Sequence, residues 1–239
     1  MLTGEMKSIL AAARHVGWVM EPEAKRLFSL AGLDVPRFRW AKDEKEVIPF
    51  GEEIGYPLVA KIVSPKVVHK SDIKGVVVGI KAQPELMEIY QRFSQVEAFN
   101  GMLIEERVSG IEVIIGAKMD VQFGPVILLG MGGTSAEIYR DVSLRMAPLN
   151  SIDVGSMVKC LKAHELLEGY RGSDPIHLGE LVKSIEVFSS LVMDLQGEIE
   201  SIDLNPVMCS STRCVVADAR IMLKRQVRIS GSPDVPVLS

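Results

Sequence analysis

The sequence predicts an α+β fold made of two lobes that share a cleft. Its 239 residues are enough for one large domain or for two small lobes. Apolar residues make up 47% of the chain and charged residues 24%, so a core of useful size can form. Predicted strands lie close together in the middle of the chain with helices on either side, which favours α+β lobes over a regular doubly wound sheet.

Charge and composition argue against several functional classes. The net charge is −4 and no basic cluster is present, which disfavours a nucleic-acid partner. No apolar run approaches the roughly 18 residues of a membrane-spanning helix, and the first 19 residues lack the pattern of a secretory signal. Cys160, Cys209 and Cys214 are an odd number in a long chain, which favours reduced thiols. We therefore expect a cytoplasmic protein without a membrane partner.

The first part of the chain is predicted to contain one helix and two strands. Pro22–Ala31 has an apolar face at helical spacing. The run 37–55 is mostly polar, and its charged residues 42–46 are expected to lie in a solvated stretch without a function. Leu58–Val63 and Val76–Ile80 are predicted strands, joined by the polar loop Ser64–Gly75.

The remainder alternates between strands and helices. Helical spacing of apolar residues predicts helices from Pro84 onward, at Ser151–Ala163 and at Ile176–Leu195. Strands are predicted at Met102–Val108, Glu112–Met119, Pro125–Leu129, Ile199–Asp203 and Cys214–Leu223. The tail after Gly231 is rich in proline and is expected to be loose.

Lys61 and the loop that follows it are the first candidates for chemistry. A lysine inside an apolar strand either lies at a sheet edge with its ammonium group in water, or points into a cleft at an anion. The loop His69–Gly75 carries lysines, a hydroxyl and a glycine, which suit phosphate binding, although the Walker spacing is absent and an ordinary polar hairpin loop fits as well. His69 is either a surface histidine or a nucleophile whose phosphoryl group the neighbouring cations would stabilise.

A glycine-rich segment, Gly130–Thr134, follows one predicted strand and precedes an expected helix. Backbone amides at such a helix start favour anions, but tight turns also require glycine. Arg140 and Arg145 lie just beyond it. These arginines either reach phosphate or pair with the neighbouring Asp141.

The late strands carry oxygen ligands. Alternation places Asp203 and Asn205 on one face of their strand, and Asp218 lies in an apolar context where a carboxylate favours a cation. Asparagine and aspartate oxygens suit Mg²⁺, with ATP phosphates completing its shell. Together with Lys61 and the glycine-containing loops, these residues predict a Mg-nucleotide site spread over the chain.

In these motifs the chain resembles the β subunit of ADP-forming acetyl-CoA synthetase, also called acetate–CoA ligase (ADP-forming), from Glu21 to Leu223. The matching stretches are Glu23-Ala24-Lys25, Tyr56 to Pro65, His69-Lys70-Ser71-Asp72, Gln122 to Val126, Gly130 to Gly133, Asp141 to Arg145, Asn205-Pro206 and Asp218-Ala219-Arg220. The resemblance implies an ATP-grasp fold, with residues 1–104 as the N-terminal lobe carrying the leading helices and phosphate loop. Residues 105–239 would form the C-terminal lobe with the hinge and the Mg-binding strands.

The resemblance also implies roles for individual residues. Lys61 would touch the ATP phosphates, Glu105, Glu106, Arg107 and Val108 would form the hinge beside adenine, and Glu112 would reach the ribose. Ser71 to Gly75, including Lys74, would cover the phosphates. Asn205 and Asp218 would hold Mg²⁺. His69 would be a phosphohistidine, with Lys70 and Arg145 as further catalytic residues.

The implied reaction is acyl-CoA + ADP + phosphate giving acid + CoA + ATP. An α subunit would carry the CoA and acyl sites and the first phosphohistidine, in an α2β2 assembly. Two departures from the family are visible: Asp203 stands where glutamate is common, and Lys74 where glycine is frequent. The alternatives are another ligase of the succinyl-CoA synthetase superfamily, which is expected to lack His69, and a non-catalytic nucleotide-sensing subunit.

Overall fold

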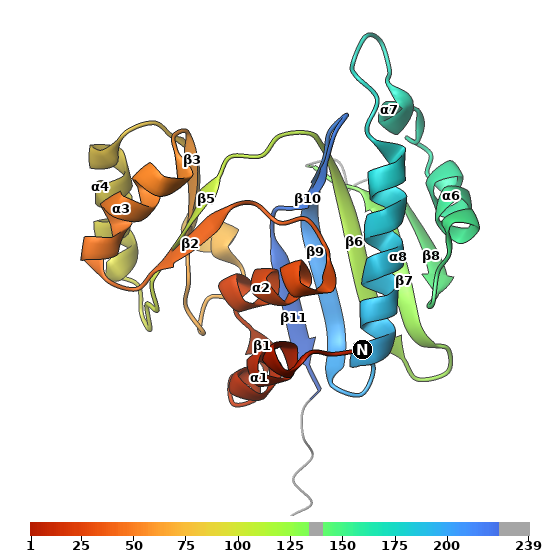
Figure 1. Ribbon diagram of the computed structural model, residues 1–239, viewed down its shortest axis with the longest axis horizontal. Coiled ribbons are helices and arrows are strands. Elements are labelled where there is room, and N and C mark those ends of the chain that lie inside the picture. Colours follow the sequence, from red (N-terminus) through yellow and green to blue (C-terminus); the bar gives the residue numbers. More distant parts are fainter. Residues whose placement is uncertain (134–140, 225–239) are drawn as a thin grey trace, which may run out of the picture.

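The chain forms two antiparallel β-sheets, each covered by helices, in two lobes that lie side by side (Figure 1). The computed structural model describes residues 1–133 and 141–224. The larger sheet has seven strands in the order β1-β11-β9-β6-β7-β8, with β10 pairing β9. The smaller sheet has four strands in the order β2-β5-β3-β4. This arrangement confirms the α+β expectation.

The larger lobe contains both ends of the described chain. Its strands are β1 (Trp18–Val19), β6 (Ile111–Asp120), β7 (Gly124–Met131), β8 (Val142–Met146), β9 (Ile199–Cys209), β10 (Cys214–Val216) and β11 (Ala219–Leu223). Its helices are α1 (Gly4–Ala13), α2 (Glu21–Ala31), α6 (Ser151–Cys160), α7 (Glu165–Glu168) and α8 (Leu178–Leu195). The long helix α8 buries Phe188 and Leu195 against the sheet because its apolar residues recur at helical spacing.

The smaller lobe is formed by residues 38–106. Its strands are β2 (Phe38–Ala41), β3 (Leu58–Ile62), β4 (Val76–Ile80) and β5 (Met102–Glu106), and its helices are α3 (Glu44–Ile54) and α4 (Gln83–Ser94). A single 3-10 turn, η1 (Lys70–Ile73), lies in the loop between β3 and β4. Leu58 and Leu86 are fully buried in its core, which is separate from that of the larger lobe.

The charge run 42–46 is largely exposed, as expected, but the segment 37–55 around it forms β2 and α3, which the sequence did not predict. Asp43 and Glu46 make a reciprocal capping box that starts the helix, so two of its charges have a structural role. Val47 and Ile54 are buried on its inner face. The sequence pattern did not indicate this narrow apolar stripe because charged side chains of the outer face outnumber it.

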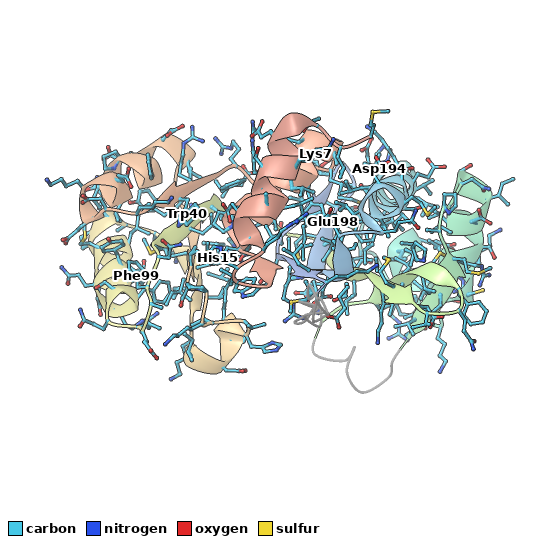
Figure 2. All side chains as sticks on the ribbon, turned by 90° about the horizontal axis from the view of Figure 1, so that it is seen from below. Lys7, His15, Trp40, Phe99, Asp194 and Glu198 are labelled. Carbon is cyan, nitrogen blue, oxygen red and sulfur yellow. The ribbon has the colours of Figure 1, made fainter. Side chains whose placement is uncertain are left out.

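The lobes divide the chain differently from the expected boundary at residue 104. Strand β1 pairs with β11, and Met6, Leu10 and Phe28 belong to the core of the larger lobe, so the leading helices are not part of the smaller lobe. Figure 2 shows Trp40 and Phe99 in the smaller lobe and Asp194 and Glu198 in the larger one. The smaller sheet continues through Glu106, two residues past the expected boundary.

Several predicted elements change length in the structure. Strand β9 continues to Cys209, and the strand predicted at Cys214–Leu223 is two strands, β10 and β11, separated at Ala217 and Asp218. The first of the late helices ends at Cys160 and the second begins at Leu178, while the predicted strand Met102–Val108 ends at Glu106. The break at Ala217 and Asp218 is the most consequential, because it turns a backbone carbonyl and a carboxylate toward the smaller lobe.

No helix within residues 1–133 and 141–224 has both the length and the apolar character needed to cross a membrane.

The placement of α2 predicts a large effect of a core substitution there. Phe28 is fully buried in the larger lobe, so Phe28→Ala should lower the free energy of unfolding by roughly 3–5 kcal/mol. Ser29 is the next residue and is exposed, so Ser29→Ala should change it by less than about 0.5 kcal/mol. Denaturant unfolding of the two variants and the wild type measures both values. Similar effects of the two substitutions would contradict the placement of α2.

Candidate functional site

A polar cavity of about 450 Å³ lies where the two lobes meet. The loop between β3 and β4 contributes His69, Lys70, Ser71 and Asp72. Strand β9 contributes Asp203 and Asn205, the segment before β11 contributes Asp218, and β11 contributes Arg220. Residues more than 130 positions apart in the sequence therefore share one cavity, and most of its walls are polar.

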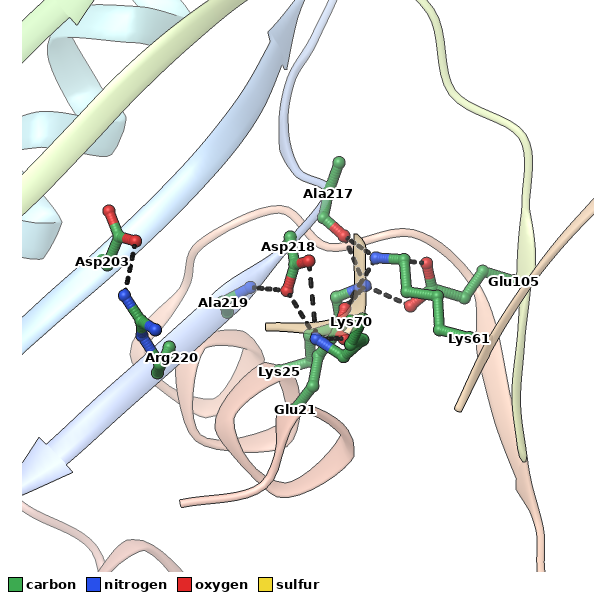
Figure 3. Close-up of polar contacts among 10 residues, drawn as sticks. All are labelled: Glu21, Lys25, Lys61, Lys70, Glu105, Asp203, Ala217, Asp218, Ala219 and Arg220. Carbon is green, nitrogen blue, oxygen red and sulfur yellow. Dashed lines mark hydrogen bonds and ion pairs between the residues drawn. The ribbon is translucent and has the colours of Figure 1, made fainter. Parts of the chain in front are cut away.

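Lys61 points from the smaller sheet into the junction between the lobes (Figure 3). Strand β3 is an interior strand, so the alternative of an edge lysine in water is wrong. Its ammonium group donates hydrogen bonds to Glu21 Oε1 at 2.7 Å and to the Ala217 carbonyl at 2.5 Å. It also lies 3.2 Å from Glu105 Oε2. The anions that face Lys61 here are the carboxylates of this chain.

Lys25 reaches the same carboxylates from helix α2. Its side chain is fully buried, and its Nζ forms ion pairs with Glu105 Oε1 and, at 2.9 Å, with Glu21 Oε1. It donates a third contact to the Ala217 carbonyl at 2.7 Å. Glu21 and Lys25 are four residues apart on one helix, so both side chains leave α2 on the same face.

Lys70 connects this buried group to the cavity. Its Nζ lies 2.7 Å from Glu21 Oε2 and 3.2 Å from Asp218 Oδ1. The contact with Glu21 is an ion pair without a well-aligned hydrogen bond, since Glu21 Oε2 has no partner of hydrogen-bond geometry. Charges therefore alternate from Glu105 through Lys61 and Lys25 to Glu21, and from there through Lys70 to Asp218. We call these six residues the charge network.

Mutual pairing keeps Glu21, Lys61 and Lys70 ionised despite their burial. Burial by itself would raise the pKa of Glu21, but Lys25, Lys61 and Lys70 together hold that pKa well below the ordinary glutamate value. Burial would lower the pKa of Lys61, yet Glu105, Glu21 and Asp218 raise it well above the ordinary lysine value. The pKa of Lys70 is raised in the same way, chiefly by Glu21 and Asp218 against the effect of burial. These groups are therefore charged at neutral pH.

Three oxygen donors line the side of the cavity formed by the larger sheet. The Asp203 carboxylate contacts Arg220 Nη2 at 3.3 Å, and the Asp218 carboxylate accepts the Ala219 amide at 2.8 Å. Burial raises the pKa of Asp203, and nearby Asp218 raises it further, while Arg220 and His69 oppose the shift. Two carboxylates that repel each other beside the Asn205 amide favour a cation, and hard oxygen donors suit Mg²⁺. Across the described residues no three His, Cys, Asp or Glu side chains group closely enough to hold a metal, so water or phosphate oxygens would have to complete the shell.

His69 is exposed in the cavity wall, directly before the turn η1. The turn ends at Lys74, whose φ of 53° lies in the left-handed region where glycine is favoured. A glycine would adopt this backbone conformation without the strain that a lysine side chain adds. Gly75 follows, and a Cβ there would lie 2.6 Å from the Ile62 side chain, so the loop returns to the sheet only with glycine at this position.

Some predicted site residues lie outside the cavity. Arg145 on β8 donates to the Leu144 carbonyl at 3.0 Å and to Ser156 Oγ at 3.3 Å. The Asp141 carboxylate accepts the amides of Lys162 and Ala163 at 2.7 and 2.9 Å. Asp141 therefore caps the turn after α6, and the predicted alternative of an arginine pair with it is wrong for Arg145.

The hinge residues and the glycine-rich segment have distinct surroundings. Glu106 pairs with Arg37 and Arg213 on the surface side of β5, while Arg107 and Val108 belong to the connection from β5 to β6. Glu112 follows Ile111 at the start of β6. Its backbone carbonyl accepts a hydrogen bond from the backbone amide of Gly132 at 2.7 Å. Thr134, Arg140 and the helix expected there lie outside the described residues.

Glu21 and Lys25 were not predicted as site residues, and Glu105 was predicted only as part of the hinge, yet all three belong to the charge network. Glu21 and Lys25 stand on the same face of α2 as buried Ala24 and Phe28. A glutamate and a lysine four residues apart within an otherwise apolar stripe are a readable signal, because such residues are almost never fully buried unless they are paired. Their partners in the smaller lobe are 40 to 80 residues away and were not readable from the sequence.

The lowered pKa of Glu21 predicts acid-sensitive folding. Because this pKa is lower in the folded chain than in the unfolded chain, protonation favours unfolding. The contribution of Glu21 to the free energy of unfolding should be fully present above the ordinary glutamate pKa of about 4.3. This contribution should decrease as the pH falls toward the lowered pKa. Glu21→Gln should be less stable at neutral pH and should lose less stability on acidification. Urea denaturation at a series of pH values tests this, with exposed Glu44→Gln as the control; equal acid dependence of Glu21→Gln and wild type would contradict it.

Comparison with known proteins supports one family over nearly the whole chain. The model of the ATP-grasp domain matches residues 10–223. The β subunit of acetate–CoA ligase [ADP-forming] I from Pyrococcus furiosus is 39% identical over 214 residues, covering 86% of this chain and 91% of the relative. The β subunit of form II from the same organism is 37% identical, covering 92% and 96%.

A solved structure agrees with these relatives. Acetyl-coenzyme A synthetase 1 of Ca. Korarchaeum cryptofilum, in complex with coenzyme A and Ca-AMPCP, superimposes with a TM-score of 0.86 at 38% identity. The match covers 91% of this chain and 99% of that chain. The resemblance deduced from the motifs is thereby confirmed: the chain belongs to the ATP-grasp family, among the β subunits of ADP-forming acetate–CoA ligases.

Proposed function

We propose that this chain is the nucleotide-binding subunit of an ADP-forming acyl-CoA synthetase and that His69 carries the phosphoryl group to and from the nucleotide. One observation carries the proposal: His69 and Lys70 share a single cavity with the oxygen donors Asn205 and Asp218. A nucleophile, a cation and Mg²⁺ ligands are the parts that phosphoryl transfer requires, since it depends on positioning and on neutralising charge.

Each group has a role in this proposal. Neutral His69 attacks phosphorus through a ring nitrogen, and Lys61 and Lys70 neutralise the phosphate oxygens. Asn205 and Asp218 would hold Mg²⁺, which supplies charge stabilisation to the nucleotide phosphates. Ser71, Lys74 and Gly75 cover the phosphates, residues 105–108 lie beside adenine and Glu112 reaches the ribose. Arg145 is a further proposed catalytic residue, although on β8 it does not line the cavity that the described residues form.

The transfer balances without a further reactant. A phosphoryl group on His69 passes to the terminal phosphate oxygen of ADP, so that the P–N bond breaks, a P–O bond forms and His69 returns to its free form. In the other direction, ATP phosphorylates His69. In two solved structures of the Korarchaeum enzyme a phosphohistidine segment is present, phosphorylated in one and pointing towards the nucleotide binding site in the other. We propose that a segment of this kind on a partner α subunit exchanges phosphate with His69.

The α subunit would also carry the coenzyme A and acyl sites, in an α2β2 assembly. The 4-hydroxybutyrate–CoA ligase [ADP-forming] of Nitrosopumilus maritimus is 36% identical, but this chain covers only 31% of that longer relative. We propose that the acid is selected largely by the partner. A cytoplasmic location fits the free thiols of Cys209 and Cys214, which lie opposite each other on β9 and β10.

Phosphate labelling tests the role of His69. The chain is mixed with its cognate α subunit, Mg²⁺ and ATP labelled in its terminal phosphate, and the acid-labile, base-stable label on this chain is measured. Wild type should be labelled, His69→Ala should lose the label, and His15→Ala, which removes an exposed histidine elsewhere, should keep it. Without the α subunit, the chain should form no acyl-CoA. Equal labelling of His69→Ala and wild type would overturn the proposed role.

A further inference from the structure

Lys25 is buried behind the candidate site and does not line its cavity. Its ammonium group has three partners: the Glu21 carboxylate, the Glu105 carboxylate and the Ala217 carbonyl (Figure 3). With no exposed surface, it has no path to a ligand in the cavity. Keeping a lone ammonium group there would be very unfavourable, so its position depends on these partners.

Lys25 shares all three partners with the lysine that faces the phosphates in the proposed function. Lys61 also contacts Glu21, Glu105 and the Ala217 carbonyl. Glu21 is contacted in addition by Lys70. Any change in how strongly Glu21 and Glu105 attract cations therefore acts on Lys61 and Lys70 at once.

The charge network is formally balanced. Its three ammonium groups, on Lys25, Lys61 and Lys70, face the three carboxylates of Glu21, Glu105 and Asp218. Asp218 is the most exposed carboxylate of the three, with 30% of its side chain accessible, against 2–3% for the other two. With a divalent cation held by Asp218, the remaining network would have three cations for two carboxylates, which would leave a net positive charge for an anion.

We propose that Lys25 is a positioning residue for the phosphate site, an inference that rests on the proposed function. By neutralising Glu21 and Glu105, Lys25 leaves Lys61 and Lys70 available to a polyphosphate. By holding the Ala217 carbonyl, it fixes the backbone directly before Asp218. Lys25 thus sets the charge and the geometry of the groups that contact the nucleotide while contacting none of it itself.

Neutral substitutions in the charge network have opposite expected effects on the two ligands. Lys25→Met leaves two ammonium groups against three carboxylates, so Lys61 and Lys70 are held more tightly and the site repels polyphosphate. The same excess negative charge does not weaken binding of a divalent cation alone. Glu105→Gln leaves three ammonium groups against two carboxylates. This excess positive charge should strengthen Mg-ADP binding and should not strengthen binding of a divalent cation alone. Lys25→Met combined with Glu105→Gln restores the balance with two of each.

The experiment compares wild type, Lys25→Met, Glu105→Gln and the double variant in two titrations. Mg-ADP binding is measured by calorimetry, and binding of Mn²⁺ alone, as a spectroscopic probe of the divalent site, by electron paramagnetic resonance. Lys25→Met should bind Mg-ADP at least about tenfold more weakly, ~1.4 kcal/mol, while binding Mn²⁺ no more weakly than wild type. Glu105→Gln should show the opposite shifts. The double variant should bind Mg-ADP more tightly than Lys25→Met.

Thermal unfolding of each variant separates positioning from folding. A merely structural role of Lys25 would weaken both ligands together with the melting temperature, and that result would overturn the inference. Unchanged Mg-ADP binding by Lys25→Met would also overturn it while leaving the proposed function intact. Absence of Mg-ADP binding by wild type would overturn the proposed function and this inference with it. If Lys25→Met does not fold, the opposite shifts of Glu105→Gln decide, and identical shifts of its two affinities would overturn the proposal.

Discussion

The buried carboxylate of Glu21 is the interaction on which the arrangement of the site depends. It belongs to α2 of the larger lobe and meets Lys61 and Lys70 of the smaller lobe, so it joins the lobes at the point where the cavity opens. Lys25 from the same helix extends the contact to Glu105 on β5. Removing one partner from such a buried group leaves an uncompensated charge and typically costs about 3–5 kcal/mol. The relative position of the two lobes and the orientation of Lys61 and Lys70 therefore have a common cause.

The break between β10 and β11 is the second constraint. A continuous strand would direct the Ala217 carbonyl into a sheet ladder, but at the break this carbonyl accepts contacts from Lys25 and Lys61. The next residue then presents its carboxylate to the cavity beside Asn205. A structural carbonyl and a candidate metal ligand are therefore adjacent in the chain, which couples the buried charges to the open side of the site. This coupling is the physical basis for expecting metal and nucleotide binding to depend on residues that touch neither.

Much of the site was predictable from local sequence, but the ion pairs that join its two lobes were not. His69, Lys70, Asn205 and Asp218 stand in short motifs that the sequence marks as candidates, and the structure brings all four to one cavity. The ion pairs of Glu21 with the smaller lobe depend on how α2 packs against the larger sheet, which is a long-range property without a local pattern. The α+β class followed from periodicity, whereas β2 and α3 were missed because their outward charges outnumber the inward apolar residues. The leading helices were assigned to the neighbouring lobe because chain order is a poor guide when β1 pairs with the last strand, β11.

The most direct test of the central claim is a crystal structure of the chain with Mg²⁺ and a non-hydrolysable ATP analogue. We expect phosphate oxygens at the ammonium groups of Lys61 and Lys70, Mg²⁺ against Asn205 and Asp218, and Lys25 still paired with Glu21 and Glu105. Nucleotide bound elsewhere would contradict the account, for example in the apolar hollow of about 480 Å³ formed by Phe123, Leu128 and Leu144. A nucleotide in the cavity that leaves both Lys61 and Lys70 without a phosphate contact would contradict it equally.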